Sequence, residues 1–443
     1  MNKQILFCLI AGLLFVSPVY AGEKINQYLP QFLKADVEFR YRFEYRDNFD
    51  FNDSSDDKDG FELLRSRLNL QWIPIKQLKF FTQLQDSRIA NDEFFSKTAF
   101  ENYMDLRQLY ADWEQVLTNA PLGMSKITIR GGRQELSYGG QRLIGGFNWS
   151  NVAQSFDGGK VMLFFDPYKL QVDGFAVEKT PIKSPREKDD LFEDSSEDRL
   201  AGYYATYKGI KDTTIEQYLL WRGTETNISF GPNGSGELDE YTAGGRIKGN
   251  LPYRFDYEAE LAGQWGDFKD KDILALMGIG ILGYTFDCPW SPRPAFEFDY
   301  GSGDSDPTDT TRRTFDNLYP TNHLFYGYMD LISLQNLNNY QFQLSVKPHK
   351  KLKLQADLHL LYLDTPKDSL YAANRAVTRT ASATSTGVSA EVGREADLTA
   401  DFKFNDYLQV LTGYSHFFAG DYLRDTGAND DADFFYLQTT IAL

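Results

Sequence analysis

The stretch from Lys34 to Arg46 alternates strictly between apolar and charged positions. Its odd positions are Ala35, Val37, Phe39, Tyr41, Phe43 and Tyr45, and every even position carries a charge. Side chains of a β-strand point alternately to opposite faces, so as a strand this segment has one apolar and one charged face. As a helix it would mix both kinds of residue around its circumference. The pattern therefore predicts a strand.

The same two-residue period recurs along the chain, and almost no segment could supply a second layer over the apolar faces. Strands that face lipid on one side and water on the other are typical of a transmembrane barrel. Long polar loops also alternate with short links, as in outer-membrane barrels. We therefore predict one all-β domain, an antiparallel transmembrane β-barrel of about eighteen strands with short periplasmic turns and long extracellular loops. The predicted strands are 34–46, 61–73, 78–88, 105–114, 125–134, 154–165, 169–178, 199–208, 213–222, 240–249, 254–266, 272–286, 294–300, 337–347, 352–363, 391–404, 407–418 and 433–443.

The first 21 residues have the features of a secretory signal peptide. Lys3 precedes an apolar run from residue 5 to residue 16, and Val19-Tyr20-Ala21 precedes Gly22. A basic start, a short apolar core and a small-residue exit predict cleavage after residue 21, which leaves residues 22–443 as the barrel domain. Cys8 then leaves with the leader, and Cys288 has no disulfide partner.

Composition narrows the function classes. The formal net charge is −17 and the aromatic content is 15%. A protein that binds nucleic acid is expected to carry the opposite sign, so we exclude that class. Rings of aromatic side chains at the two bilayer interfaces would account for the many tyrosines and phenylalanines.

One segment closely resembles the alginate export family of outer-membrane proteins. It runs from Gly132-Arg133-Gln134 through Gly145 and Trp149 to Ser155-Phe156-Asp157-Gly158, and further matches lie at 86–88, 302–304, 314–323 and 414–420. The resemblance implies a barrel of eighteen strands whose pore is narrowed by inward loops and lined by arginines. It also implies that a polyuronate leaves the periplasm through this pore.

Cationic residues two positions apart share a strand face, and by alternation that face is the lumen. Rings of fixed cations select anions, and the guanidinium fork suits carboxylates. The candidate pore-lining residues are Arg40, Arg42, Arg65, Arg67, Arg88, Arg107, Arg130, Arg133, Arg142, Arg246, Lys248 and Arg394. The alternative is that these cations only neutralise interior acids, which include Glu38, Glu44, Asp256, Glu258 and Glu260.

An enzyme is the competing class, because catalysis in such barrels needs a base with a nucleophile or acid in reach. His359 with Asp357, and His416 with Ser415, are the nearest approaches to such a pair, and we interpret both as structural. We therefore predict no enzymatic activity.

Metal and cofactor chemistry is weakly indicated. Asp304, Asp306 and Asp309 are weak calcium candidates in an extracellular loop, because their spacing matches no known calcium loop. The chain also has no phosphate-binding glycine loop and no zinc spacing. We expect no cofactor and no metal.

The predicted function is passive passage of an anionic polysaccharide through the bacterial outer membrane, with the protein a monomer. Its expected partners are the transported anion, outer-membrane lipid and periplasmic export components. A diffusion porin for uptake of small anionic nutrients is the alternative, since both functions would use the same lumen. The sequence does not assign the direction of transport.

Overall fold

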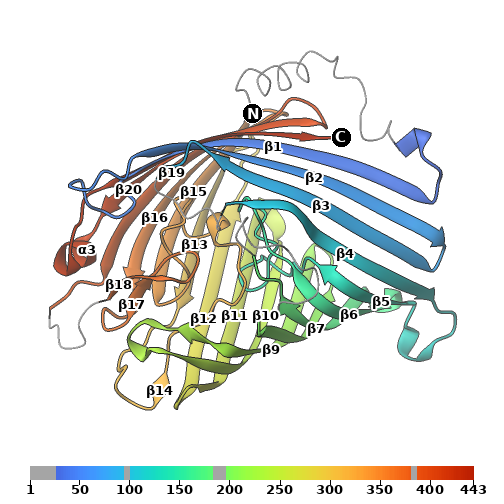
Figure 1. The fold of residues 1–443 in the computed structure, drawn as a ribbon, viewed down its shortest axis with the longest axis horizontal. Coiled ribbons are helices and arrows are strands. Elements are labelled where there is room, and N and C mark those ends of the chain that lie inside the picture. Colours follow the sequence, from blue (N-terminus) through green and yellow to red (C-terminus); the bar gives the residue numbers. More distant parts are fainter. Residues whose placement is uncertain (1–25, 94–99, 183–195, 381–386) are drawn as a thin grey trace.

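The chain forms a closed barrel of eighteen antiparallel strands (Figure 1). The computed structural model describes residues 26–93, 100–182, 196–380 and 387–443. The barrel strands are β1 (Leu33–Asp47), β2 (Asp59–Ile75), β3 (Leu78–Ala90), β4 (Asn102–Val116), β5 (Lys126–Gln134), β6 (Phe156–Phe165), β7 (Leu170–Lys179), β8 (Asp198–Tyr207), β9 (Thr213–Ser229), β10 (Ser235–Asn250), β11 (Phe255–Phe268), β12 (Lys271–Tyr284), β13 (Arg293–Gly301), β15 (Leu337–His349), β16 (Leu352–Leu363), β19 (Glu391–Lys403), β20 (Leu408–Ala419) and β21 (Ala432–Ala442).

The predicted fold class and strand count are confirmed. Each strand pairs with its neighbour in the ring, and β21 closes the barrel on β1, with Arg40 opposite Thr440. The largest difference lies at β9 and β10, which extend well beyond the predicted strands 213–222 and 240–249. Leu238 still pairs with Thr224 there, so the hairpin continues past the expected end of the wall.

Smaller elements occupy the loops and turns. In Figure 1, β14, β17, β18 and α3 gather at the lower left, which is the end of the barrel that carries the long loops. These elements are β14 (Thr311–Arg312), β17 (Ser369–Tyr371), β18 (Val377–Thr380) and α3 (Asp421–Thr426). The 3-10 turns are η2 (Pro121–Gly123), η3 (Asp166–Tyr168), η4 (Gly231–Asn233), η5 (Pro252–Arg254) and η6 (Asn322–Leu324).

The outer face of the barrel is apolar and uncovered. Trp72 is 48% exposed and Phe342 is 51% exposed, although both lie within strands. Their neighbours in sequence point to the interior, as the period of two requires. Such exposed apolar rows are stable where lipid covers them.

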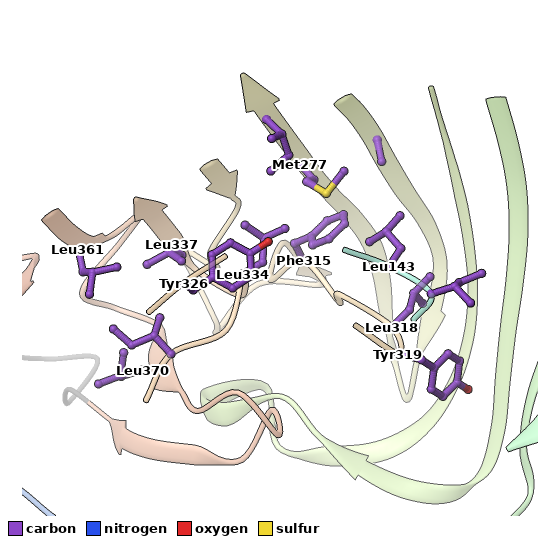
Figure 2. Close-up of a cluster of buried hydrophobic side chains, with 14 of the residues drawn as sticks. Leu143, Met277, Phe315, Leu318, Tyr319, Tyr326, Leu334, Leu337, Leu361 and Leu370 are labelled. Atoms are coloured by element: carbon purple, nitrogen blue, oxygen red, sulfur yellow. The ribbon is translucent and has the colours of Figure 1, made fainter. Parts of the chain in front are cut away.

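Strand β12 is apolar on both faces. Leu274 and Leu276 point outward and are exposed, whereas Ala275 and Met277 point inward and are buried. The inner face is dry because loops fold into the lumen and pack against it. Figure 2 shows Met277 beside Phe315 and Leu143, which come from these loops.

Two long loops enter the lumen and pair with each other. The first inward loop is residues 135–155 and the second is residues 302–336. The backbone N–H of Tyr319 donates to Leu143 O at 2.8 Å, and that of Gly145 donates to Tyr319 O at 2.9 Å. The two loops therefore form one hydrogen-bonded body across the barrel.

The predicted signal peptide, residues 1–21, lies outside the described residues. Within the parts of the chain that the structure describes, every helix is too short or too polar to cross a bilayer.

Candidate functional site

Arginines line the lumen face of β1 and β2. Arg40 and Arg42 on β1 alternate with the outward residues Phe39 and Tyr41, and Arg40 lies directly opposite Arg65 of β2. The period of two places Arg67 on the same face. All four arginines are buried. The exposed outward face and the buried inward face together identify this surface as the basic wall of the lumen.

The first inward loop covers the basic wall with backbone oxygens. Arg40 donates to Asn148 O at 2.8 Å and to Ser150 O at 3.1 Å. Arg65 donates to the same two oxygens, at 2.8 and 3.1 Å. A guanidinium group presents several donors in a fixed fork, so one arginine can hold two nearby carbonyls of the same loop. The loop is therefore anchored to the wall by its main chain.

Arg40 and Arg67 have only neutral partners. Arg40 also donates to Asn151 Oδ1 at 3.1 Å, and Arg67 donates to Gln85 Oε1 at 2.7 Å and to Asn148 Oδ1 at 2.9 Å. Within the described residues, neither arginine has a carboxylate at ion-pairing distance, and Arg67 Nη2 is buried without a hydrogen-bond partner. Glu38 lies opposite Arg67 but forms its ion pair with Arg65, so Arg40 and Arg67 have no direct ion pair.

The other predicted cations on the lumen face of the strands have acidic partners. Arg42 pairs with Glu44, Arg65 with Glu38, Arg107 with Glu135, Arg130 with Asp112, Arg246 with Glu216 and Glu258, and Lys248 with Glu258. Arg107 reaches the lumen through a register shift between β3 and β4, which changes the alternation at that residue. For these residues the structure favours charge neutralisation over an exposed ring of cations.

Buried carboxylates gather on the strands from β9 to β19. They come from β9, β11, β13, β16 and β19, and they are Glu216, Glu258, Glu260, Glu297, Asp299, Asp357, Glu395 and Asp397. Arg142 of the first inward loop pairs with Glu297 and, at 3.1 Å, with Asp299. Glu260 and Glu395 instead bind neutral donors. The basic wall of β1 and β2 is thus accompanied by an arc of buried acids that runs from β9 to β19.

A three-layer stack joins the two inward loops to the basic wall. The Arg42 guanidinium carbon lies 3.8 Å from the centre of the Trp149 ring. Trp149 stacks in turn on His323 of the second inward loop, with 3.7 Å between ring centroids. Cation–π and ring contacts of this kind are strongest when water is excluded. His323 is buried and its Nδ1 lies 3.1 Å from Asp330.

Asp316 attaches the second inward loop to the barrel wall. It is fully buried and accepts hydrogen bonds from Arg222 of β9 and, at 3.3 Å, from Arg375. Burial alone would raise the pKa of this carboxyl, but Arg222, Arg375 and Arg312 outweigh burial and lower it to about 2. Asp316 therefore remains charged at every physiological pH.

The predicted lumen position is wrong for Arg88 and Arg394. Arg88 lies opposite Leu64, on the outward face of β3, whereas its neighbour Ser87 donates to Asn151 O inside the barrel. Arg394 lies opposite Leu360 and Phe418, which also face outward. Both arginines have the parity of lipid-facing residues, so they cannot line the pore.

The predicted lumen position is also wrong for Arg133. It lies opposite Leu109 and Asp157 in an unbroken register that places Arg130 and Asp112 inside. Arg133 donates to Asp157 at 2.9 Å on the outer face. Lys160 of β6, opposite Arg130, is a lumen cation that the prediction omits.

A cavity of about 540 Å³ opens at the short-turn end of the lumen. It is polar, and its charged lining residues are Lys208, Asp212, Lys248, Asp256, Glu258, Arg293 and Glu297. Arg293 pairs with Asp256, and Lys248 lies 3.5 Å from Glu258. Of the predicted residues, Lys248 is the one that this cavity exposes to solvent.

The weak calcium candidates do not converge on a common point. Asp304 and Asp306 accept hydrogen bonds from backbone groups of their own turn, and Asp309 pairs with Arg313 at 2.8 Å. Among the described residues, no group of three acidic, histidine or cysteine side chains is arranged to hold a metal.

The histidines form no acid–base pair with a nucleophile in the described structure. His416 faces outward and lies 2.9 Å from Asp433, whereas Ser415 faces the lumen. His359 is buried and lies 3.1 Å from Asn339 Oδ1.

Several residues of the inward loops have no signal in the sequence. Trp149 and His323 meet only because two loops that are far apart in the sequence pair in the lumen. Arg222 and Arg312 hold Asp316 and Glu240. The sequence shows only that Arg222 lies in a weakly alternating strand. It does not show that Asp316 is the partner of Arg222.

The comparisons with known proteins agree on a family and a fold. The alginate export profile matches residues 32–436. Similar solved structures include Pseudomonas aeruginosa OpdO, with 11% identity, a TM-score of 0.58, and coverage of 94% of this chain and 99% of that one. P. aeruginosa OccK8 (OprE) has 12% identity, a TM-score of 0.59 and coverage of 93% and 98%. P. aeruginosa OpdK with vanillate has 11% identity, a TM-score of 0.57 and coverage of 92% and 98%. No curated protein sequence matches the chain.

Proposed function

The chain belongs to the alginate export family of outer-membrane barrels, and from that premise we propose that it conducts an anionic polysaccharide passively through its lumen. Its barrel fold and family make it a channel of the bacterial outer membrane rather than an enzyme. The proposal concerns the substrate, an alginate-like polyuronate, and the arginines that select it.

The observation that carries this proposal is that Arg40 and Arg67 have no direct ion pair. A cation without a direct ion pair attracts a mobile anion more strongly than a paired one, because an ion pair presents almost no net charge. A unit charge about 6 Å from a permeating anion contributes roughly 0.7 kcal/mol in a water-like dielectric. Each of the two arginines is therefore expected to change anion preference by roughly threefold.

An acid on the far side of the lumen supports the same proposal. Glu260 on β11, which lies across the ring of eighteen strands from β1 and β2, repels an anion toward the basic wall. A narrow, low-dielectric passage strengthens such a transverse field. The carboxylate groups of a polyuronate would then follow the basic wall.

Reversal-potential measurements in planar bilayers test the proposal. The wild type is expected to prefer anions, and the double variant Arg40→Gln/Arg67→Gln to lose roughly three- to tenfold of that preference. Arg40→Lys/Arg67→Lys keeps the two charges but removes the forked guanidinium groups that anchor the loop. This variant therefore separates selectivity from loop anchoring, and it should remain anion-selective. Arg88→Gln/Arg394→Gln removes two charges from the outer face and should change nothing. Cation preference in the wild type would refute the proposal.

Uptake of small anionic nutrients is the alternative function. The lumen is spanned by two paired loops, and one similar barrel was solved with vanillate, a small carboxylate. An oligouronate that transiently blocks the current and crosses to the far chamber supports the polysaccharide. Exclusion of the oligomer together with passage of small carboxylates supports the alternative.

A further inference from the structure

The two ends of the barrel carry opposite charge. The turns at the short-turn end expose Lys208 and Lys211 after β8, and Lys347, Lys350 and Lys353 around the turn between β15 and β16. We refer to these five residues as the rim lysines. At the opposite end, residues 48–58 contain four aspartates and one lysine, and residues 420–431 contain four aspartates and one arginine.

The rim lysines have no acidic partners. Within the described residues, no carboxylate lies at ion-pairing distance from any of the five, and Lys353 instead donates to Gln355 Oε1 at 2.7 Å. Other cations of this rim are neutralised, since Arg254 pairs with Asp287 and Arg293 with Asp256. The rim lysines therefore leave a net positive charge on the exposed surface.

The rim lysines flank the polar cavity at the short-turn end. Lys208 lines it directly, and Gln343 of β15 extends its lining toward the turn that holds Lys350. The strands between the two lysine groups, β9 to β13 and β15, are consecutive neighbours in the barrel. The cavity therefore lies along the arc of wall between two groups of unpaired cations.

We propose that the rim lysines, at the mouth of this cavity, form the capture site for a carboxylated polysaccharide arriving from the periplasm. The exposed lysines attract the anionic chain to the short-turn end of the lumen. The acidic loops repel the same chain at the other end, so capture is faster from the short-turn side. This inference rests on the proposed function and adds a direction to it.

Sided blocking of single-channel current tests the capture site. An oligouronate hexamer is added to one chamber at a time, at about 0.1 M salt, where exposed charges still act over about 10 Å. Cys288 is exposed in the turn between β12 and β13, so a bulky impermeant maleimide identifies the short-turn side. Electrostatic steering raises association rates by 10-fold to 1,000-fold, so we expect at least a tenfold faster on-rate from that side.

Two matched variants locate the effect. Lys347→Gln/Lys350→Gln/Lys353→Gln should lower the on-rate from the short-turn side at least threefold and weaken its salt dependence. Lys34→Gln/Lys76→Gln/Lys169→Gln removes the same charge from exposed positions on the other arc of the rim and should leave the on-rate within twofold.

The outcomes separate this inference from the proposed function. Equal on-rates from the two sides, or equal losses in the two triple variants, would overturn the capture site while leaving an anion-selective pore intact. A cation-selective wild type, or one that the hexamer never blocks, would instead refute the proposed function. An on-rate asymmetry that disappears only in the first triple variant supports the capture site.

Discussion

Replacing Asp316 by asparagine is expected to loosen the second inward loop from the barrel wall. Asp316 binds Arg222 and Arg375 through its carboxylate, and its backbone N–H donates to Gln264 Oε1 at 2.8 Å. The substitution keeps the backbone hydrogen bonds and the side-chain volume. It removes only the negative charge of Asp316. Arg222 and Arg375 then remain at the wall with one fewer carboxylate to neutralise them.

The pKa of Asp316 sets the size of this effect. Its fall from 3.8 to about 2 is roughly two units, and each unit corresponds to about 1.4 kcal/mol. The charged form therefore contributes about 2.5 kcal/mol to the attachment of the loop, which is on the order of a 60-fold change in the ratio of attached to detached states. Because the pKa is lowered in the folded protein, this stability is fully present above pH 4. It is lost as the pH falls through 2.

Single-channel recording in planar bilayers measures the ratio. Asp316→Asn is expected to show frequent excursions to a larger conductance at neutral pH, whereas the wild type shows them only as the pH approaches 2. Asp306→Asn removes the same charge from an exposed part of the same loop and serves as the matched control. Current traces of Asp316→Asn that match the wild type, in a barrel shown to be folded by its heat-modifiable migration on a gel, would refute the reasoning.

Two further substitutions test the loop contacts and the register. Trp149→Ala removes the ring that lies between Arg42 and His323, so current noise should rise while the stability of the barrel is unchanged. Trp149→Phe keeps a ring and should retain a quiet current. An alanine variant as quiet as the wild type would argue against the stack. Phe342→Arg places a charge against lipid near the middle of β15 and should cost about 2–4 kcal/mol in urea unfolding from liposomes. Gln343→Arg, one residue away but facing the cavity, should cost far less, and equal losses would contradict the assigned faces.

The sequence alone determined the wall of the barrel. A period of two specifies which face of each strand meets lipid, and the alternation of long loops with short links specifies the order of the strands. All eighteen predicted strands are present for this reason. Arg88 shares the parity of Leu84, an outward residue, so a lumen position is at odds with the period itself. Arg133 follows two glycines, which carry no side chain to mark the face.

Only the tertiary structure decided what fills the lumen. The inner face of β12 reads as one more apolar row, and nothing local shows that Phe315 and Leu143 cover it. Whether the charge of a lumen arginine is neutralised, and whether its side chain is covered, depend on partners that can lie more than 100 residues away, as with Arg40 and Ser150. Local periodicity records the direction of a side chain, whereas its partner is fixed by how distant loops fold back into the barrel. That is why the strand faces could be predicted and the charge pattern of the pore could not.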